Sequence, residues 1–154
     1  MPILLVRHAE AGHRSDWHGD DSRRPLSPAG RGQARLLARA LAPMGPSRIL
    51  SSPTARCVET VEPLSERLGL PVEETDDLAE GRAAAAVGLV RSLAGHTVVA
   101  VSHGDVIPEV LGALAREDGM HLPPTVEWAK ASTWVLASAG GRFVSAGYRD
   151  PPSR

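Results

Sequence analysis

The sequence predicts an α/β protein in which helices cover both faces of a mainly parallel sheet, a three-layer α/β/α sandwich with a late antiparallel hairpin. Residues 3–6 and 98–101 form continuous apolar runs, which are typical of strands buried on both faces. Segments with helical periodicity separate such runs, as in βαβ units. Near the C-terminal end, two short apolar runs flank Gly140 and Gly141, which is typical of a β-hairpin.

The first half of the chain supplies two strands and two helices. A polar loop over residues 11–26 follows the first strand. Ser27 and Pro28 predict a helix start, because serine caps a helix and proline fits its first turn. A short strand is expected over residues 48–51, followed by a second cap-and-proline pair at Ser52 and Pro53. Gly69 is expected to end the helix that begins there.

The second half continues the alternation and ends in the hairpin. We expect a weak strand over 70–72, a helix over 83–94, a strand over 96–102, a helix over about 105–116, and hairpin strands over 132–138 and 143–147.

Length and composition indicate one domain of ordinary globular type. The chain has 154 residues, of which we assign 1–149 to the domain and 150–154 to a proline-rich tail. A net charge of −1 gives no overall attraction to nucleic acid or anionic lipid, so neither is expected as a partner. A single cysteine and the lack of a signal peptide or apolar membrane span favour a cytoplasmic location.

Basic side chains follow three of the expected strands at their carboxyl ends. Arg7 and His8 end the first strand, Arg56 lies one turn into the helix after the second, and His103 follows a later one. Ligands of open parallel sheets bind at this edge. Arginine forks match tetrahedral oxyanions, and neutral histidine is a nucleophile. The pattern predicts a pocket for a phosphoryl group.

These residues lie in motifs that occur in the same order in a known family. The motifs are LLVRHAEA, RPLSPAGRGQA, SSPTARCVET, LAEG and VVAVSHGDVI. The chain thus resembles the histidine phosphatase superfamily, which has the phosphoglycerate-mutase-like fold. It is most similar to short SixA-type phosphohistidine phosphatases and to phosphatase domains found behind Nudix hydrolase domains.

The resemblance implies a metal-independent phosphatase that hydrolyses phosphomonoesters or phosphoramidates through a phosphohistidine on His8. It implies that Arg7 and Arg56 clamp the phosphoryl oxygens, that His103 donates to them, and that Glu80 protonates the leaving group. The substrate would be a phosphorylated small molecule, a nucleotide or a phosphohistidine protein. Two alternatives stay open, a mutase-type phosphoryl transfer and a non-catalytic regulator that binds phosphorylated ligands.

The sequence departs from the family in one place and leaves the proton donor undecided. Ala9 stands where the family usually has glycine, so its carbonyl can still orient His8 provided that its φ is negative. Other carboxylates near the expected mouth are alternatives to Glu80: Glu10, Asp16, Asp20 and Asp21.

The polar loop offers candidate specificity residues. Arg14, Arg23 and Arg24 could reach further phosphates and Trp17 could stack on a base, although a solvated polar loop is the favoured interpretation. Trp128 and Trp134 are expected to be packing residues, and Cys57 a small buried residue of its helix.

His8, His13, His18 and His103 could be imagined as metal ligands, but known metal-site spacings are missing. We therefore expect no metal and no cofactor, and the oligomeric state stays open.

Overall fold

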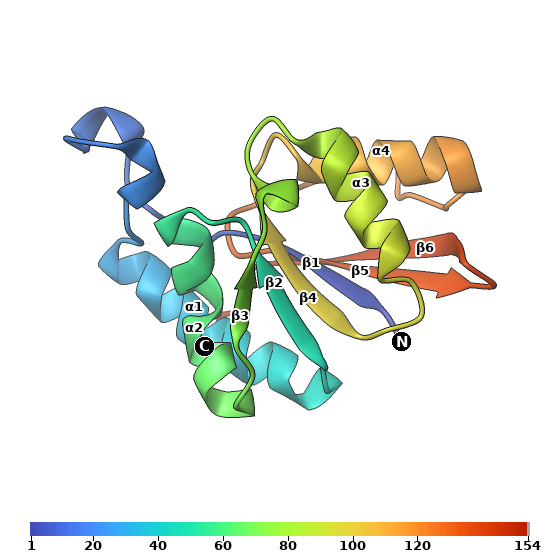
Figure 1. Ribbon diagram of the computed structural model, residues 1–154, viewed down its shortest axis with the longest axis horizontal. Helices are drawn as coiled ribbons and strands as arrows, with labels where there is room; N and C mark the ends of the chain where they lie inside the picture. Colours follow the sequence, from blue (N-terminus) through green and yellow to red (C-terminus); the bar gives the residue numbers. More distant parts are fainter. Residues whose placement is uncertain (154) are drawn as a thin grey trace.

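The computed structural model describes residues 1–153 and consists of a six-stranded sheet covered by helices on both faces (Figure 1). The strand order is β3-β2-β4-β1-β5-β6. The first four strands of the chain are parallel to one another, whereas β5 and β6 add an antiparallel hairpin beside β1. The strands are β1 (Ile3–Arg7), β2 (Arg48–Ser51), β3 (Val72–Glu74), β4 (Val98–Ser102), β5 (Thr133–Ala139) and β6 (Arg142–Arg149).

Two helices cover each face of this sheet (Figure 1). The α-helices are α1 (Pro28–Leu41), α2 (Ala55–Leu68), α3 (Ala83–Ser92) and α4 (Ile107–Asp118). Single 3-10 turns are η1 (Arg14–Asp16), η2 (Asp21–Arg23), η3 (Ala42–Met44) and η4 (Asp76–Leu78). The predicted α/β sandwich with a late hairpin is therefore confirmed.

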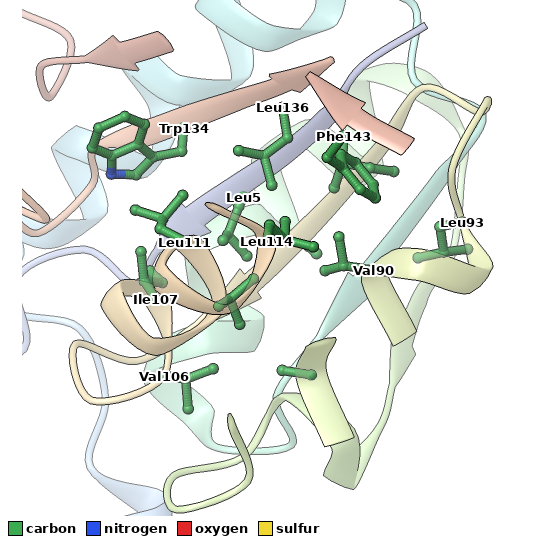
Figure 2. Packing of buried hydrophobic residues seen from close by; sticks show 14 of the residues in the cluster. Leu5, Val90, Leu93, Val106, Ile107, Leu111, Leu114, Trp134, Leu136 and Phe143 are labelled. Carbon is green, nitrogen blue, oxygen red and sulfur yellow. The ribbon is translucent and has the colours of Figure 1, made fainter. Parts of the chain in front are cut away.

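The continuous apolar runs are explained by the two faces of the sheet. Along β1, Leu4 and Val6 pack with the core under α1 and α2, while Ile3 and Leu5 pack with the core under α3 and α4. Figure 2 shows the second core, in which Leu5 lies among residues of α3, α4 and the hairpin. Each side chain buried in this way contributes about 1.5–3 kcal/mol to the stability of the fold. A strand that alternated apolar and polar residues would bury apolar side chains on one face only, so it could not pack against both layers of helices.

The register of the parallel strands brings their carboxyl ends level with one another. Arg7 pairs with Ser102 across β1 and β4, and Ser51 pairs with Val101 across β2 and β4. The residues that follow each strand, His8, Ser52 and His103, therefore emerge together at one edge of the sheet.

The start of α2 differs from the expected cap at Ser52. The helix begins at Ala55, and its N-cap is Thr54. Ser52 instead continues the β2 pairing through its N–H, which donates to the Val101 carbonyl at 3.0 Å. Its hydroxyl lies 2.9 Å from Nε2 of His103, so the residue supports the edge of the sheet rather than a helix.

The other differences are shifts of element ends. The strand expected over 70–72 lies at Val72–Glu74, because the Leu70 N–H still bonds to Ser65 in the turn that ends α2. The helix expected from 105 begins at Ile107, and the helix expected to reach 94 ends at Ser92.

The C-terminal segment has no helix or strand over residues 150–153, and residue 154 of the expected tail lies outside the described residues. Over residues 1–153, every helix is too short or too polar to pass through a membrane.

Candidate active site

A pocket of about 470 Å³ opens at the carboxyl edge of the sheet and is lined by Arg7, His8, Arg56 and His103. We call these four residues the floor. The sequence predicted all four side chains to meet, and the structure brings them together. A larger hollow between α1 and the C-terminal segment is lined, among the described residues, by neither histidine nor carboxylate, so its side chains offer no comparable chemistry.

His8 is held in one orientation by the backbone that follows it. Its Nδ1 lies 2.8 Å from the Ala9 carbonyl oxygen, which can only accept, so Nδ1 carries the hydrogen and Nε2 is left with a lone pair. Of the non-glycine residues in 1–153, Ala131 alone has a positive φ, so Ala9 meets the condition set by the sequence. Burial lowers the pKa of His8 to about 3, which keeps the imidazole neutral.

His103 faces His8, with the two ring centroids 5.5 Å apart. Its Nε2 lies 2.9 Å from the Ser52 hydroxyl, and its Nδ1 is buried without a hydrogen-bond partner, 3.4 Å from a Glu80 carboxylate oxygen. Burial, and next the positive charge of Arg56, lower the pKa of His103 to about 4. With Nε2 as the acceptor, the neutral ring presents an unused Nδ1–H to the pocket.

Arg56 is 1% exposed and is held by backbone and carboxylate groups. Its Nη1 donates to the Asp21 carbonyl at 3.0 Å, and its Nη2 pairs with the carboxylates of Asp21 and Glu80. Its Nε is buried and unpaired.

Arg7 approaches the floor from the opposite side and depends on a glycine. Its Nη1 donates to the Trp128 carbonyl at 2.8 Å, and its Nε also lacks a partner. A Cβ atom at Gly104 would lie 2.8 Å from Nη2 of Arg7, so any other residue there would displace the guanidinium. Arg7, Arg56 and His103 thus line one pocket and each has a buried nitrogen without a hydrogen-bond partner, a set of residues that suits a tetrahedral oxyanion.

The RPLSPAGRGQA motif fixes the chain just after His8. The Ser27 hydroxyl donates to the Glu10 carboxylate, and it caps α1 by accepting from the Gly30 N–H. A Cβ atom at Gly30 would collide with the Glu10 carbonyl, so α1 can lie against this backbone only with glycine there. Gln33 accepts from the Glu10 N–H at 2.9 Å. The motif therefore positions the backbone that follows His8, and of its residues Arg24 alone lines the pocket.

These contacts also separate the candidate carboxylates. The hydrogen bond from Ser27 holds the pKa of Glu10 below its usual value and turns Glu10 toward α1, away from the residues that line the pocket. Asp16 and Asp20 are exposed and do not line it. Asp21 pairs with Arg56 but does not line the pocket. Glu80 does line the pocket, and one of its carboxylate oxygens lies 3.4 Å from Nδ1 of His103.

The loop residues divide into three groups. Arg14 lines the pocket and pairs with Asp21 and Glu80. Arg24 also lines it but is 8% exposed and donates to the Ala11 carbonyl at 2.7 Å, so it supports the loop. Arg23 and Trp17 are not among its lining residues, and the Trp17 indole N–H donates instead to the Asp20 carbonyl.

Besides glycines, four residues that sequence reasoning did not place here also line the pocket. They are His13, Asp105, Trp128 and Lys130. The interpretation of Trp128 as a packing residue is wrong, because Trp128 is 37% exposed at the pocket, whereas Trp134 is buried as expected. Asp105 accepts from the Gly81 N–H at 2.8 Å and so holds the Glu80 loop. Together with Arg14 and Glu80, Trp128 and Lys130 form what we call the rim.

The histidines weighed as metal ligands do not form one cluster. His8 and His103 lie on the floor, while His18 is exposed on the loop and does not line the pocket. Within residues 1–153, no group of three or more histidine, cysteine and carboxylate side chains has the arrangement of a metal site. Cys57 is buried on the inner stripe of α2, as expected, and burial raises its pKa to about 11.

Comparison with known proteins identifies the family. The model of the histidine phosphatase superfamily (branch 1) matches residues 3–89, more than half of the chain. An 8-oxo-(d)GTP phosphatase of Mycolicibacterium smegmatis is 35% identical over 156 residues. That match covers 97% of this chain but 48% of the relative, so the chain spans about half the length of that protein.

Solved structures agree with this assignment. The phosphohistidine phosphatase SixA in complex with tungstate is 23% identical, with a TM-score of 0.74 over 99% of this chain and 97% of that one. A structure assigned as SixA from Agrobacterium tumefaciens is 25% identical, with a TM-score of 0.79 over 97% and 98%. A mycobacterial glucosyl-3-phosphoglycerate phosphatase with inorganic phosphate is 20% identical, with a TM-score of 0.73 over 99% and 97%.

The family model matches more than half of the chain, and the solved structures share its fold. The predicted resemblance is confirmed: this chain belongs to the histidine phosphatase superfamily.

Proposed function

We propose that the chain hydrolyses phosphomonoesters or phosphoramidates through a covalent phosphohistidine on His8. The observation that carries this proposal is the orientation of His8, whose Nδ1 is bound to the Ala9 carbonyl while the ring stays neutral. A neutral imidazole with one fixed N–H has its other nitrogen available as a nucleophile. Arg7, Arg56 and His103, each with a buried nitrogen that lacks a partner, line the same pocket as His8.

In the first step, Nε2 of His8 attacks phosphorus in line with the leaving group. The N–P bond forms as the P–O or P–N bond to the leaving group breaks, and the electron pair of that bond stays on the leaving atom. Arg7, Arg56 and the Nδ1–H of His103 bind the three equatorial oxygens. Positioning and charge of this kind supply most of the rate enhancement in phosphoryl transfer.

In the second step, water replaces His8 on phosphorus. Glu80 gives a proton to the leaving atom in the first step and takes one from the water in the second. The O–P bond forms, the N–P bond breaks, and its electron pair returns to Nε2. Glu80 suits this role because its carboxylate lies beside both Arg56 and His103.

A second candidate narrows the substrate to a nucleotide. The relative from Mycolicibacterium smegmatis is an 8-oxo-(d)GTP phosphatase, although the chain spans only 48% of its length. The exposed face of Trp128 at the rim favours a planar leaving group, because aromatic rings stack on one another. A panel of nucleoside di- and triphosphates, dinucleoside polyphosphates, phosphohistidine peptides, sugar phosphates and 3-phosphoglycerate, compared by kcat/KM, tests this candidate.

Hydrolysis of p-nitrophenyl phosphate in excess EDTA tests the proposed reaction itself. We expect phosphate release, since none of the assigned steps uses a metal. Binding of inorganic phosphate without any turnover would favour a non-catalytic regulator. Transfer of the phosphoryl group to a second hydroxyl compound in preference to water would favour a mutase.

A further inference from the structure

Lys130 is the only lysine among the 17 lysine and arginine residues of the chain, and it lies at the pocket. It belongs to the segment between α4 and β5, on the side of the floor that carries Arg7 and His8. Neither the sequence motifs nor the proposed reaction steps give it a role. Because Lys130 lies at the pocket, its amine is available to contact a part of the substrate other than the transferred phosphoryl group.

The other cations of the pocket show why Lys130 differs. Arg14, Arg24 and Arg56 each pair with a carboxylate of Asp21 or Glu80. Within residues 1–153, Arg7 and Lys130 form no such ion pair. Arg7 is bound to the Trp128 carbonyl and belongs to the floor. Within the described residues, Lys130 is therefore the positive charge at the rim that forms no ion pair, and the carboxylate whose pKa it helps to lower, Glu10, does not line the pocket.

The backbone holds Lys130 close to the nucleophile. The N–H of the next residue, Ala131, donates to the carbonyls of Arg7 at 3.1 Å and His8 at 3.2 Å. Ala131 is fully buried and has a φ of 67°, a conformation that alanine adopts only under tight constraint. The position of the Lys130 main chain is thus fixed, while its flexible four-carbon side chain lets the ammonium group take several positions at the rim.

The pocket also has room beyond the transferred group. Its volume of about 470 Å³ falls in the range of small-molecule sites and exceeds the space of one tetrahedral anion on the floor. The leaving group must occupy the remainder, between the floor and the rim. An anionic group attached directly to the transferred phosphoryl would enter this space.

We propose that Lys130 is a specificity-determining residue that binds a second anionic group on the leaving group, so that diphosphates are preferred over esters of uncharged alcohols. The assignment rests on the proposed function, because the floor must hold the terminal phosphoryl while Lys130 holds the next one. An ammonium group is a compact charge with three rotatable donors, which suits a phosphate whose exact orientation varies. This assigns a charge preference that neither the family nor the floor dictates.

Binding of two phosphonates tests the assignment without any turnover. Methylenediphosphonate has two anionic groups and methylphosphonate has one, and neither is hydrolysed by phosphoryl transfer. We expect wild type to bind the diphosphonate about tenfold more tightly, the effect of one charge-assisted hydrogen bond, as measured by calorimetry. Lys130→Gln should remove this preference, and Lys130→Arg should retain most of it.

Arg116→Gln is the matched control, because it removes one exposed positive charge from α4 outside the pocket. It should leave the preference unchanged. Equal weakening of both phosphonates in Lys130→Gln, or no weakening of either, would overturn the assignment. Loss of the preference in Arg116→Gln as well would attribute it to overall charge and would also overturn the assignment.

The single lysine allows a direct readout of the same contact. Reductive ¹³C-methylation labels only two amines in the chain, Lys130 and the N-terminal amine of the exposed Met1. Methylenediphosphonate should shift the Lys130 signal and leave the Met1 signal in place. If wild type selects the diphosphonate but hydrolyses no phosphate compound, the proposed function fails and the role of Lys130 in binding stands.

Discussion

The floor and the rim of the pocket are built in different ways. The floor residues follow buried strands, and His8, Arg56 and His103 are 6%, 1% and 2% exposed. The rim comes from segments without regular structure or from turns, and the side chains of Arg14 and Glu80 are 64% and 41% exposed. Backbone carbonyls contact Arg7, His8 and Arg56 on the floor, whereas Arg14 and Glu80 of the rim contact other side chains.

This difference separates the reaction from its selectivity. Groups that bind the transferred phosphoryl must stay within a few tenths of an ångström of their productive positions, and buried strand ends provide that precision. Groups that meet the leaving group can vary without disturbing the floor. We therefore expect floor variants to lose the reaction with every substrate and rim variants to change the order of substrates.

Among variants that keep His8, the largest loss is expected for Arg56→Gln, which removes the guanidinium charge from the floor. The kcat/KM for p-nitrophenyl phosphate should fall by about 10²–10³, as for other preorganised donors to a developing charge. Arg23→Gln is the control, since Arg23 lies on the same loop as Asp21 but does not line the pocket. It should change kcat/KM by less than about twofold, as is usual for surface substitutions. Equal losses of kcat/KM in the two variants would contradict the distinction between floor and loop.

Glu80→Gln should produce a loss that depends on the leaving group. A general acid contributes about 10²–10⁴ to rate, but p-nitrophenolate departs without needing a proton. We expect a fall of about 10² with an alkyl phosphate and less than about tenfold with p-nitrophenyl phosphate. Asp105→Asn, which affects the hydrogen bond to Gly81, should shift both substrates by similar factors. A uniform loss in Glu80→Gln would exclude Glu80 as the proton donor.

Gly104→Ala tests the precision of the floor with one methyl group. Because the new Cβ would lie 2.8 Å from Nη2 of Arg7, the guanidinium must move, and we expect about a tenfold loss of kcat/KM, less than the 10² that a full ångström can cost. Gly88→Ala in α3 is the matched control, because a Cβ there meets nothing within 4 Å. It should leave activity intact and stabilise the helix by about 0.5–1 kcal/mol. Full activity in Gly104→Ala would show that Arg7 has room to move.

The smallest effect is on stability against pH. The folded-state pKa values of His8 and His103 are lowered to about 3 and about 4, below the 6.5 of an unperturbed histidine. The unfolded chain thus binds more protons than the folded chain as pH falls below 6.5, so stability declines from there down to about pH 3. Replacing His8 by Gln should flatten urea-derived unfolding free energies between pH 6.5 and 4, whereas His18→Gln on the exposed loop is the control. An unchanged slope in His8→Gln would contradict a buried neutral imidazole.

The sequence predicted the floor because each of its residues stands at a recognisable place. Arg7, His8 and His103 directly follow apolar runs, and parallel strands end at the same edge. The family resemblance added Glu80, which the structure places beside Arg56 and His103. Cap signals were less reliable, since Ser52 has the sequence of a helix cap but extends the edge of the sheet.

The rim could not be predicted in the same way. Trp128 and Lys130 lie in a segment without helical or alternating periodicity, so nothing in the pattern places them beside Arg7. Their approach depends on the Ala131 N–H reaching the carbonyls of Arg7 and His8, a contact between residues more than a hundred positions apart. In the polar loop, Arg24 is buried by its bond to the Ala11 carbonyl, which composition does not reveal.

The central claim is that His8 carries the phosphoryl group, and trapping the intermediate tests it most directly. Wild type quenched during turnover of ³²P-labelled substrate should hold acid-labile, base-stable phosphate on the peptide that contains His8. His8→Ala should hold none and should have no turnover, while His13→Ala, which changes another histidine lining the pocket, should still be labelled. Acid-labile phosphate on the His8→Ala protein would contradict the account.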